Sequence, residues 1–299
     1  MIGEIGIFNV RTLILGKMKE LIKNAYKSFA GETEYLFGQP FARKTDILIL
    51  ALHSTPKSHQ PSFESLVEWT LKHYVPLSPK DLLLVEANPE RYTEGPYVIF
   101  TFDDGLKNNL YSAQYLSSRG VDALYFVVPH FIEASNSEEY YIQYIRPNPD
   151  RKIDNTKDDV SSMTWEDLKQ IQALGHTIGS HTMTHRLHSK MTEEEIKFEI
   201  IQSKSILSER LGSPIDHFAS PNNTLWSVNS VAAALIKENY KFHHTTIPGI
   251  FDISLLEKGA LYRRNVECHW PSGRIKFAMG YYDLRRWQAP QAALFHLVP

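Results

Sequence analysis

The sequence contains one cysteine, no excess of either charge and no long apolar run. Because Cys268 has no second cysteine to pair with, an internal disulfide is excluded and a reducing compartment is permitted. Lys and Arg number 32 and Asp and Glu 34, a formal net charge of -2, without the clustered basic excess of a nucleic-acid-binding surface. No apolar run approaches the ~18 residues of a membrane span, and a signal peptide's basic start, apolar core and cleavage site are absent. We therefore expect a cytoplasmic protein that does not bind nucleic acid.

The first 44 residues are predicted to form a helical extension, followed by one large domain over residues 45–299. Residues 11–29 place apolar side chains at helical spacing beside basic ones, which is typical of a basic amphipathic helix. The apolar positions are Leu13, Ile14, Met18, Leu21, Ile22 and Tyr26, and the basic ones are Arg11, Lys17, Lys19, Lys23 and Lys27. Two interpretations stay open: peripheral contact with the inner face of a membrane, or a cap packed on its own domain.

Apolar segments alternate with amphipathic ones along the large domain. Helices are predicted at residues 63–74, 108–119, 165–174, 192–211 and 228–240. Strands are predicted at residues 46–52, 98–102, 123–128, 176–181, 217–221 and 241–246, with shorter ones near 261–266 and 275–278. This alternation indicates repeated βαβ units and a mostly parallel sheet, with enough strands to close a barrel. The polar stretch over residues 132–162 is predicted to be a long loop.

Two adjacent carboxylates, Asp103 and Asp104, follow the apolar strand at residues 98–102 and precede Gly105. Parallel α/β folds keep their chemistry at the C-terminal ends of strands, which makes the two acids candidate functional residues. The alternative is an ordinary Asp-Gly turn. His53 and His181 also come at the ends of predicted strands.

His181 and His185 are four residues apart. On a straight strand they would lie ~13 Å apart, too far to share a metal that needs each nitrogen at about 2.0–2.1 Å. The chain must therefore bend directly after the strand if the two histidines act as a pair. Two histidines and one carboxylate with an open position form a recognised catalytic zinc arrangement. The alternative is two ordinary surface histidines in a chain that holds 13.

These segments together resemble the polysaccharide deacetylases of carbohydrate esterase family four. Residues 101–105 (TFDDG) match the first motif of that family and residues 181–185 (HTMTH) match the second, while residues 126–129, 163–168 and 175–180 resemble its flanking stretches. The resemblance implies a distorted (β/α) barrel and a divalent metal, zinc being the expected ion. It also implies that Asp104, His181 and His185 hold the metal and that Asp103 is the catalytic base.

The third motif departs from the family pattern. The family usually has Phe-Arg-Pro-Pro-Tyr-Gly, or Phe-Ala-Tyr-Pro-Tyr-Gly in one branch, whereas residues 218–223 read FASPNN. The branch with alanine includes poly-N-acetylglucosamine deacetylases, in which a histidine near the N-terminus is the general acid. Similarity to that branch implies His53 as the acid and Arg263 as the partner of Asp103. A buried structural histidine and a surface salt bridge are the respective alternatives, and Asn222-Asn223 leave the oxyanion geometry and the substrate fit open.

The expected activity is metal-dependent hydrolysis of the acetamide of an N-acetylated amino sugar in surface-polysaccharide or glycolipid assembly. A nucleotide- or lipid-linked intermediate is the expected substrate, since no export signal is found. One alternative is a deformylase or another amide hydrolase on the same metal site. The other is a catalytically silent carbohydrate-binding relative, which the altered third motif suggests.

Overall fold

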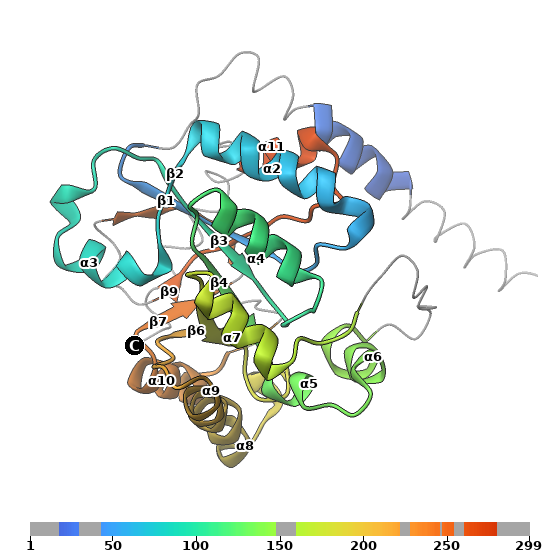
Figure 1. Ribbon diagram of the computed structural model, residues 1–299, viewed down its shortest axis with the longest axis vertical. Coiled ribbons are helices and arrows are strands. Elements are labelled where there is room, and N and C mark those ends of the chain that lie inside the picture. Colours follow the sequence, from blue (N-terminus) through green and yellow to red (C-terminus); the bar gives the residue numbers. More distant parts are fainter. Residues whose placement is uncertain are drawn as a thin grey trace, which may run out of the picture.

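The computed structural model describes residues 18–29, 43–147, 160–221, 228–245, 247–253 and 260–279. In these ranges a ten-stranded sheet carries helices on its outer side (Figure 1). The strands are β1 (Asp46–Leu52), β2 (Val75–Pro76), β3 (Tyr97–Phe102), β4 (Ala123–Val127), β5 (Thr177–Ser180), β6 (His217–Ala219), β7 (Phe242–His244), β8 (Phe251–Asp252), β9 (Ala260–Leu261) and β10 (Arg264–Asn265).

A first helix covers residues 18–29, and the other helices follow the strands in alternation. They are α2 (Gln60–His73), α3 (Leu82–Ala87), α4 (Asn109–Ser118), α5 (Pro129–Ile132), α6 (Ser137–Tyr140), α7 (Trp165–Ala173), α8 (Glu193–Lys197), α9 (Ser203–Leu211), α10 (Ser230–Asn239) and α11 (Ser272–Met279). Short π-helices cover Tyr141–Ile145 and Phe198–Gln202, and 3-10 turns cover Lys57–His59, Pro79–Asp81, Pro89–Arg91 and His188–Lys190.

The sheet is parallel along the order β10-β1-β3-β4-β5-β6-β7-β9, and β8 pairs antiparallel with β1. Strands β1 and β3 are buried along their whole length because alternate side chains enter two different cores. Leu48 and Leu50 pack in the core that includes the helices, while Ile47 and Ile49 pack in a second core on the opposite face. The predicted α/β class and distorted barrel are confirmed.

The sheet curls so that its two edge strands, β9 and β10, come close together in space, and they are also consecutive along the chain. Only Tyr262 and Arg263 separate β9 at one edge from β10 at the other. No strand pairing among the described residues joins these two edges, so a two-residue crossing of the chain takes the place of a closed ring of hydrogen bonds. Arg263 lies at this crossing, which we call the seam.

Two predicted segments differ in the structure. Residues 275–278, predicted as a strand, belong to helix α11, because three apolar residues and one lysine are too few to distinguish a helical from a strand period. The predicted loop over residues 132–162 contains helix α6 and the π-helix Tyr141–Ile145, and its residues 148–159 lie outside the described ranges.

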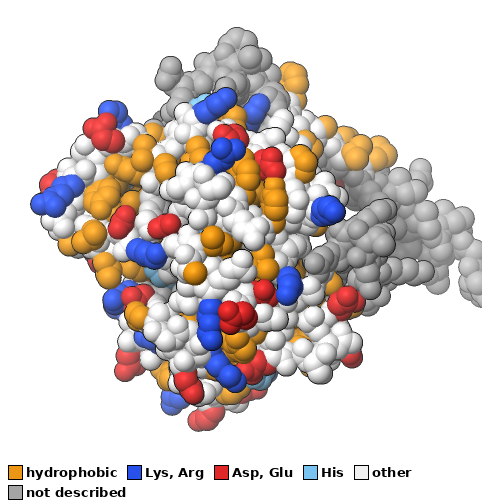
Figure 2. Space-filling view, viewed as in Figure 1, with side chains coloured by type: hydrophobic (Ala, Val, Ile, Leu, Met, Phe, Trp, Pro, Cys, Tyr) orange, Lys and Arg blue, Asp and Glu red, His pale blue; other side chains and the backbone are white. Residues whose placement is uncertain are grey.

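The N-terminal helix (residues 18–29) leaves its apolar residues exposed. Met18, Leu21 and Ile22 are 52%, 73% and 63% exposed, and Figure 2 shows hydrophobic side chains at the surface over this helix. The helix contacts α11, where the ammonium of Lys27 lies 5.8 Å from the ring centre of Phe277. Residues 11–17 of the predicted helix are outside the described ranges. Of the helices that the structure describes, none has the length and apolarity to cross a membrane.

Candidate metal centre and catalytic pocket

The two aspartates lie at the C-terminal edge of the sheet, directly after β3. The N–H of Asp103 donates to the carbonyl of Leu52 at 2.9 Å, so the chain stays paired with β1 for one residue beyond the strand. Asp104 then adopts a left-handed φ of 76° and both carboxylates are 1% exposed. Because β1 and β3 pair in register with Leu52 opposite Phe102, His53 and Asp103 follow at the same edge. A joint role of His53 and Asp103 requires β1 and β3 to be neighbours, and they are.

The two histidines follow β5 through a sharp bend. Thr182 and His185 both have φ 67°, and the N–H of His185 donates to Oγ1 of Thr182 at 2.9 Å. The imidazole centres of His181 and His185 consequently lie 5.0 Å apart, as the predicted bend required. Among the described residues other than glycine, Asp104, Thr182 and His185 are the ones with positive φ. Such conformations cost on the order of 1–3 kcal/mol each and concentrate at functional sites.

A buried carboxylate holds this bend in place. Glu199, 1% exposed, accepts hydrogen bonds from the N–H groups of Met183 and Thr184 at 2.9 and 2.8 Å, and another from the Thr184 hydroxyl. It comes from the π-helix Phe198–Gln202, 16 and 15 residues beyond the two amides that it binds. Sequence reasoning missed Glu199, because an acid on the buried side of a helix carries no local sign of its partner.

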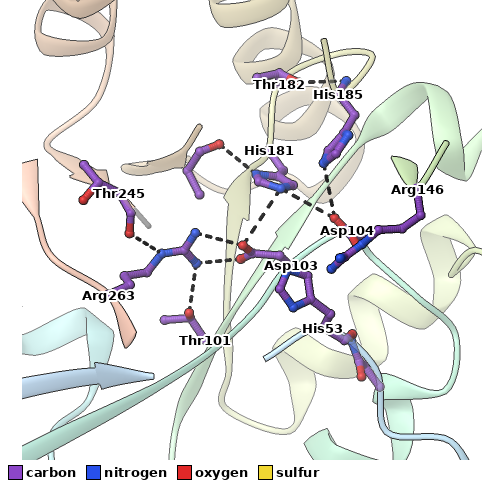
Figure 3. Close-up of polar contacts among 12 residues, drawn as sticks. His53, Thr101, Asp103, Asp104, Arg146, His181, Thr182, His185, Thr245 and Arg263 are labelled. Carbon is purple, nitrogen blue, oxygen red and sulfur yellow. Dashed lines mark hydrogen bonds and ion pairs between the residues drawn. The ribbon is translucent and has the colours of Figure 1, made fainter. Parts of the chain in front are cut away.

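Asp104, His181 and His185 form a set that fits a metal ion (Figure 3). The Nδ1 atoms of His181 and His185 lie 2.8 and 3.2 Å from the carbonyl oxygens of Ala219 and Tyr144, to which Nδ1–H donates. Each Nε2 is then left with a lone pair and faces Oδ1 of Asp104, at 3.6 and 3.4 Å. The three ligand atoms lie within 4.8 Å of one another. Oδ2 of Asp104 is buried without a hydrogen-bond partner among the described residues, as expected of an oxygen placed for a cation.

The protonation states also suit a metal. Burial alone would raise the pKa of Asp104, but its contact with the His185 ring and the charges of His53 and Arg146 hold that pKa far below its usual range. Burial lowers the pKa of His181 to about 4. At neutral pH the carboxylate is therefore ionised and the imidazole is neutral, which are the forms that bind metals.

Asp103 is paired with Arg263, and its Oδ2 also lies 4.0 Å from Nε2 of His181. Arg263 donates to both carboxylate oxygens at 2.6 and 2.8 Å, and its side chain is fully buried. Further bonds to Oγ1 of Thr101 and the carbonyl of Thr245, both at 3.0 Å, fix the guanidinium. Burial would raise the pKa of Asp103, but the charge of Arg263 outweighs it and the net pKa is lowered. The predicted pairing of Asp103 and Arg263 is present, and it is buried rather than a surface salt bridge.

His53 borders the same site beside a cavity of about 360 Å³. Its Nδ1 lies 2.8 Å from Oε1 of Glu267, and Figure 3 shows its ring next to the two aspartates. Burial alone would lower the pKa of His53, but the charge and hydrogen bond of Glu267 outweigh it and raise the pKa. Glu267, which sequence reasoning missed, follows the edge strand β10 and is brought to His53 by the pairing of β10 with β1.

Arg146 is a second arginine of the site that sequence reasoning missed. It follows the π-helix Tyr141–Ile145, lines the cavity and places Nε 3.9 Å from Oδ2 of Asp104. Its side chain is 44% exposed, so the charge faces the solvent side of the site.

The third motif is described only in part. Residues His217–Ala219 form β6, and the carbonyl of Ala219 positions His181. Ser220 Oγ lies 2.8 Å from Nε2 of His243, which holds the end of β6 against β7. Asn222 and Asn223 lie outside the described residues.

Comparisons with known proteins agree with this arrangement. The polysaccharide deacetylase family model matches residues 90–240, which is half of the chain, and the chain belongs to this family. No curated protein matches the chain.

Several solved structures share the fold. They include the Streptococcus pyogenes deacetylase PplD in complex with acetate (18% identity, TM-score 0.59, 78% of this chain and 98% of that chain). IcaB from Ammonifex degensii is similar at 18% identity and TM-score 0.60, over 80% of this chain and 99% of that chain. The BpsB deacetylase domain from Bordetella bronchiseptica is similar at 15% identity and TM-score 0.57, over 75% and 97%. Similarity at this identity establishes the common fold.

Proposed function

We propose that this polysaccharide deacetylase is a metal-dependent N-deacetylase that hydrolyses the acetamide of an N-acetylated amino sugar. The observation that carries the proposal is the buried set of Asp104, His181 and His185 beside a second carboxylate, Asp103, that is held by its own arginine. A divalent ion on this set would supply a Lewis acid for the acetyl carbonyl and the attacking water. Two imidazoles and one carboxylate are ligands that suit zinc.

Asp103 is the proposed general base. It accepts the proton of the water that attacks the acetyl carbon, while Arg263 keeps the carboxylate ionised and fixes its orientation. The division of labour between the two aspartates follows from their partners. Asp103 has both oxygens on Arg263, whereas Asp104 leaves a buried oxygen without a hydrogen bond.

His53 is the proposed general acid. The departing amine needs a proton when the carbon–nitrogen bond breaks, and Glu267 raises the pKa of His53 so that a larger fraction is protonated near neutral pH. The same hydrogen bond fixes Nδ1 and directs Nε2 toward the site.

The charges of the site favour a developing oxyanion. The positive charges of Arg263 and Arg146 offset the negative charges of Asp103 and Asp104. A divalent ion would therefore give the site a net positive charge. A negative charge that forms on the acetyl oxygen is stabilised by this field without reorganisation of the protein.

The N-terminal helix supports a substrate carried on a lipid. Its Met18, Leu21 and Ile22 are exposed beside Lys19 and Lys23, a pattern that binds anionic membrane surfaces. We therefore propose peripheral membrane contact through residues 11–29 and a lipid-linked amino sugar from surface-polysaccharide or glycolipid assembly as substrate. A nucleotide-linked sugar is the soluble alternative, and the cytoplasmic location stays a prediction.

The test measures acetate and formate released from matched N-acetyl and N-formyl amino sugars by the zinc-loaded protein. Acetate release that disappears together with the metal in His181→Ala supports the proposal, and His130→Ala, which changes a histidine outside the metal set, is the control. Faster formate release identifies a deformylase on the same site. Sugar binding without release of either acid identifies a silent carbohydrate-binding relative.

A further inference from the structure

A second cavity, of about 470 Å³, lies between α2 and α11 and does not include the residues of the metal site. In Figure 1 these two helices lie together at the edge of the molecule, beside the N-terminal helix. The lining combines two indoles with hydroxyl groups and contains no carboxylate: Pro61, Ser62, Ser65, Leu66, Trp69, Trp270, Ser272, Ile275 and Lys276. We call this cavity the α2–α11 groove.

The two indoles of the groove are held in place by other side chains. The ring of His73 stacks on Trp69 with the ring centres 4.5 Å apart, and the guanidinium of Arg274 lies 3.7 Å from the ring centre of Trp270. Ser62 and Ser65 are exposed on the same face of α2 as Trp69, since the three positions are separated by three and four residues. Rigid aromatic rings flanked by hydroxyl groups are features of a preformed ligand site.

The groove adjoins the cavity beside His53, here called the catalytic pocket, because the same two chain segments line both. Pro56 and His59 line the catalytic pocket, and Pro61 and Ser62, just beyond them, line the groove. On the opposite side, residues 267–269 line the pocket and Trp270 lines the groove. The rings of His59 and His269, with centres 6.0 Å apart, belong to the lining of the catalytic pocket where these segments pass to the groove. A long ligand bound at the metal site therefore meets the groove next.

We propose that the α2–α11 groove binds a further sugar residue of the same glycan whose acetamido group lies at the metal site. The inference rests on the proposed function. Sugar rings present a face of C–H groups that packs on an indole and a rim of hydroxyl groups that bond to serine hydroxyls, which matches Trp69, Trp270 and the three serines. The enzyme then recognises a glycan of at least two units rather than a single sugar.

Two cationic side chains lie at the groove. Lys276 lines it, and the guanidinium of Arg274 lies against Trp270 and interacts with the carboxylates of Glu20 and Glu267. A neutral sugar unit, with no charge of its own, is compatible with this lining.

Binding is tested in the zinc-loaded Asp103→Asn protein, so that the result does not depend on turnover. Calorimetry with N-acetylglucosamine and its soluble 1,4- and 1,6-linked oligomers should show affinity that rises with length. Trp270→Ala and Ser65→Arg should each remove the gain for the longer ligands, by about tenfold. Ser65 is exposed on α2, so its replacement fills the groove without disturbing the core. Trp165→Ala, a tryptophan of α7 outside both cavities, is the matched control.

Kinetics of acetate release separate this inference from the proposed function. For Trp270→Ala, kcat/KM should fall about tenfold on the longest oligomer and stay within about twofold on the single sugar. An equal fall on both substrates, or a wild-type affinity that does not change with oligomer length, overturns the groove proposal. Alkyl glucosides that occupy the groove more tightly as the alkyl chain grows would instead assign it to a lipid chain. Absence of any acetate release overturns the proposed function, while the calorimetric result on the groove still stands.

Discussion

Replacing Arg263 with methionine tests how the carboxylate of Asp103, the proposed general base, is kept ionised inside the protein. Arg263 is fully buried and donates to both oxygens of Asp103, which is itself 1% exposed. In Arg263→Met the carboxylate stays buried without its partner, and the pKa of Asp103 rises because burial disfavours the charged form. The folded variant must then either bury an unpaired charge or take up a proton.

The cost of that proton sets the size of the effect. An aspartate in the unfolded chain has a pKa of ~3.9, so protonating it costs ~1.4 kcal/mol per pH unit above that value, about 4 kcal/mol at pH 7 and about 2 kcal/mol at pH 5.5. The first figure agrees with the ~3–5 kcal/mol expected for removal of one partner of a buried pair. In the wild type the pKa of Asp103 is lowered, so its contribution to stability is complete above pH 4 and is lost only at more acidic pH.

Urea unfolding of the protein in EDTA at pH 5.5 and pH 7 gives the free energies without a contribution from bound metal. Asp103→Asn combined with Arg263→Met should be more stable at pH 7 than Arg263→Met alone, because the unpaired charge is gone. Arg186→Met, which breaks an exposed ion pair with Glu195, is the control and should cost no more than ~1 kcal/mol. An Arg263→Met penalty that is equal at both pH values, or a double variant no more stable than the single one, refutes the reasoning.

Four further changes probe the rest of the site and the N-terminal helix. Asp103→Asn should retain zinc by elemental analysis and lower turnover at least ~10²-fold, and equal loss of metal would contradict the separate roles of the two aspartates. Glu267→Gln should lower the pKa of His53, so the high-pH limb of the plot of kcat against pH shifts to lower pH by about one unit. An unchanged plot excludes His53 as the acid. Glu199→Ala should weaken zinc binding ~10–100-fold in a chelator competition, because the bend between His181 and His185 loses its hydrogen bonds to Glu199. Glutamine at the basic positions of the N-terminal helix should weaken binding to anionic vesicles by up to ~1 kcal/mol per position, measured by sedimentation, while turnover of a soluble sugar is unchanged. Equal sedimentation of the variant and the wild type excludes the membrane role. These positions are Lys19, Lys23 and Lys27.

The parts of the site that depend on short stretches of chain were predictable from the sequence. Asp103-Asp104 after a buried strand and the bend between His181 and His185 each follow from a few adjacent residues and the geometry of strands. The place of Arg263 beside Asp103 could be expected only from the resemblance to a family, since 160 positions separate the pair. The sequence also predicted a helix at the N-terminus, and its exposed apolar face appears only in the structure.

Glu199, Glu267 and Arg146 could not be predicted, because each acts through a partner far away in the chain. A strand was predicted near residues 261–266, but the pairing of β10 with β1 that brings Glu267 to His53 left no sign in the sequence. The prediction of a strand at residues 275–278 was wrong, because a four-residue segment with three apolar side chains does not distinguish the helical period of 3.6 from the strand period of 2.

The seam between β9 and β10 determines when the active site is completed during synthesis of the chain. The ribosome releases Asp103, Asp104, His181 and His185 well before Arg263, which lies on the crossing that joins the two sheet edges. A nascent chain that has folded β1 to β6 would hold Asp103 next to a hydrophobic core with no arginine to neutralise it, and burial of that carboxylate is disfavoured until the last strands emerge. The charge pair thus couples burial of the ionised Asp103, the proposed base, to the arrival of the C-terminal strands, so a truncated chain lacks both the sheet edge and the partner of this carboxylate.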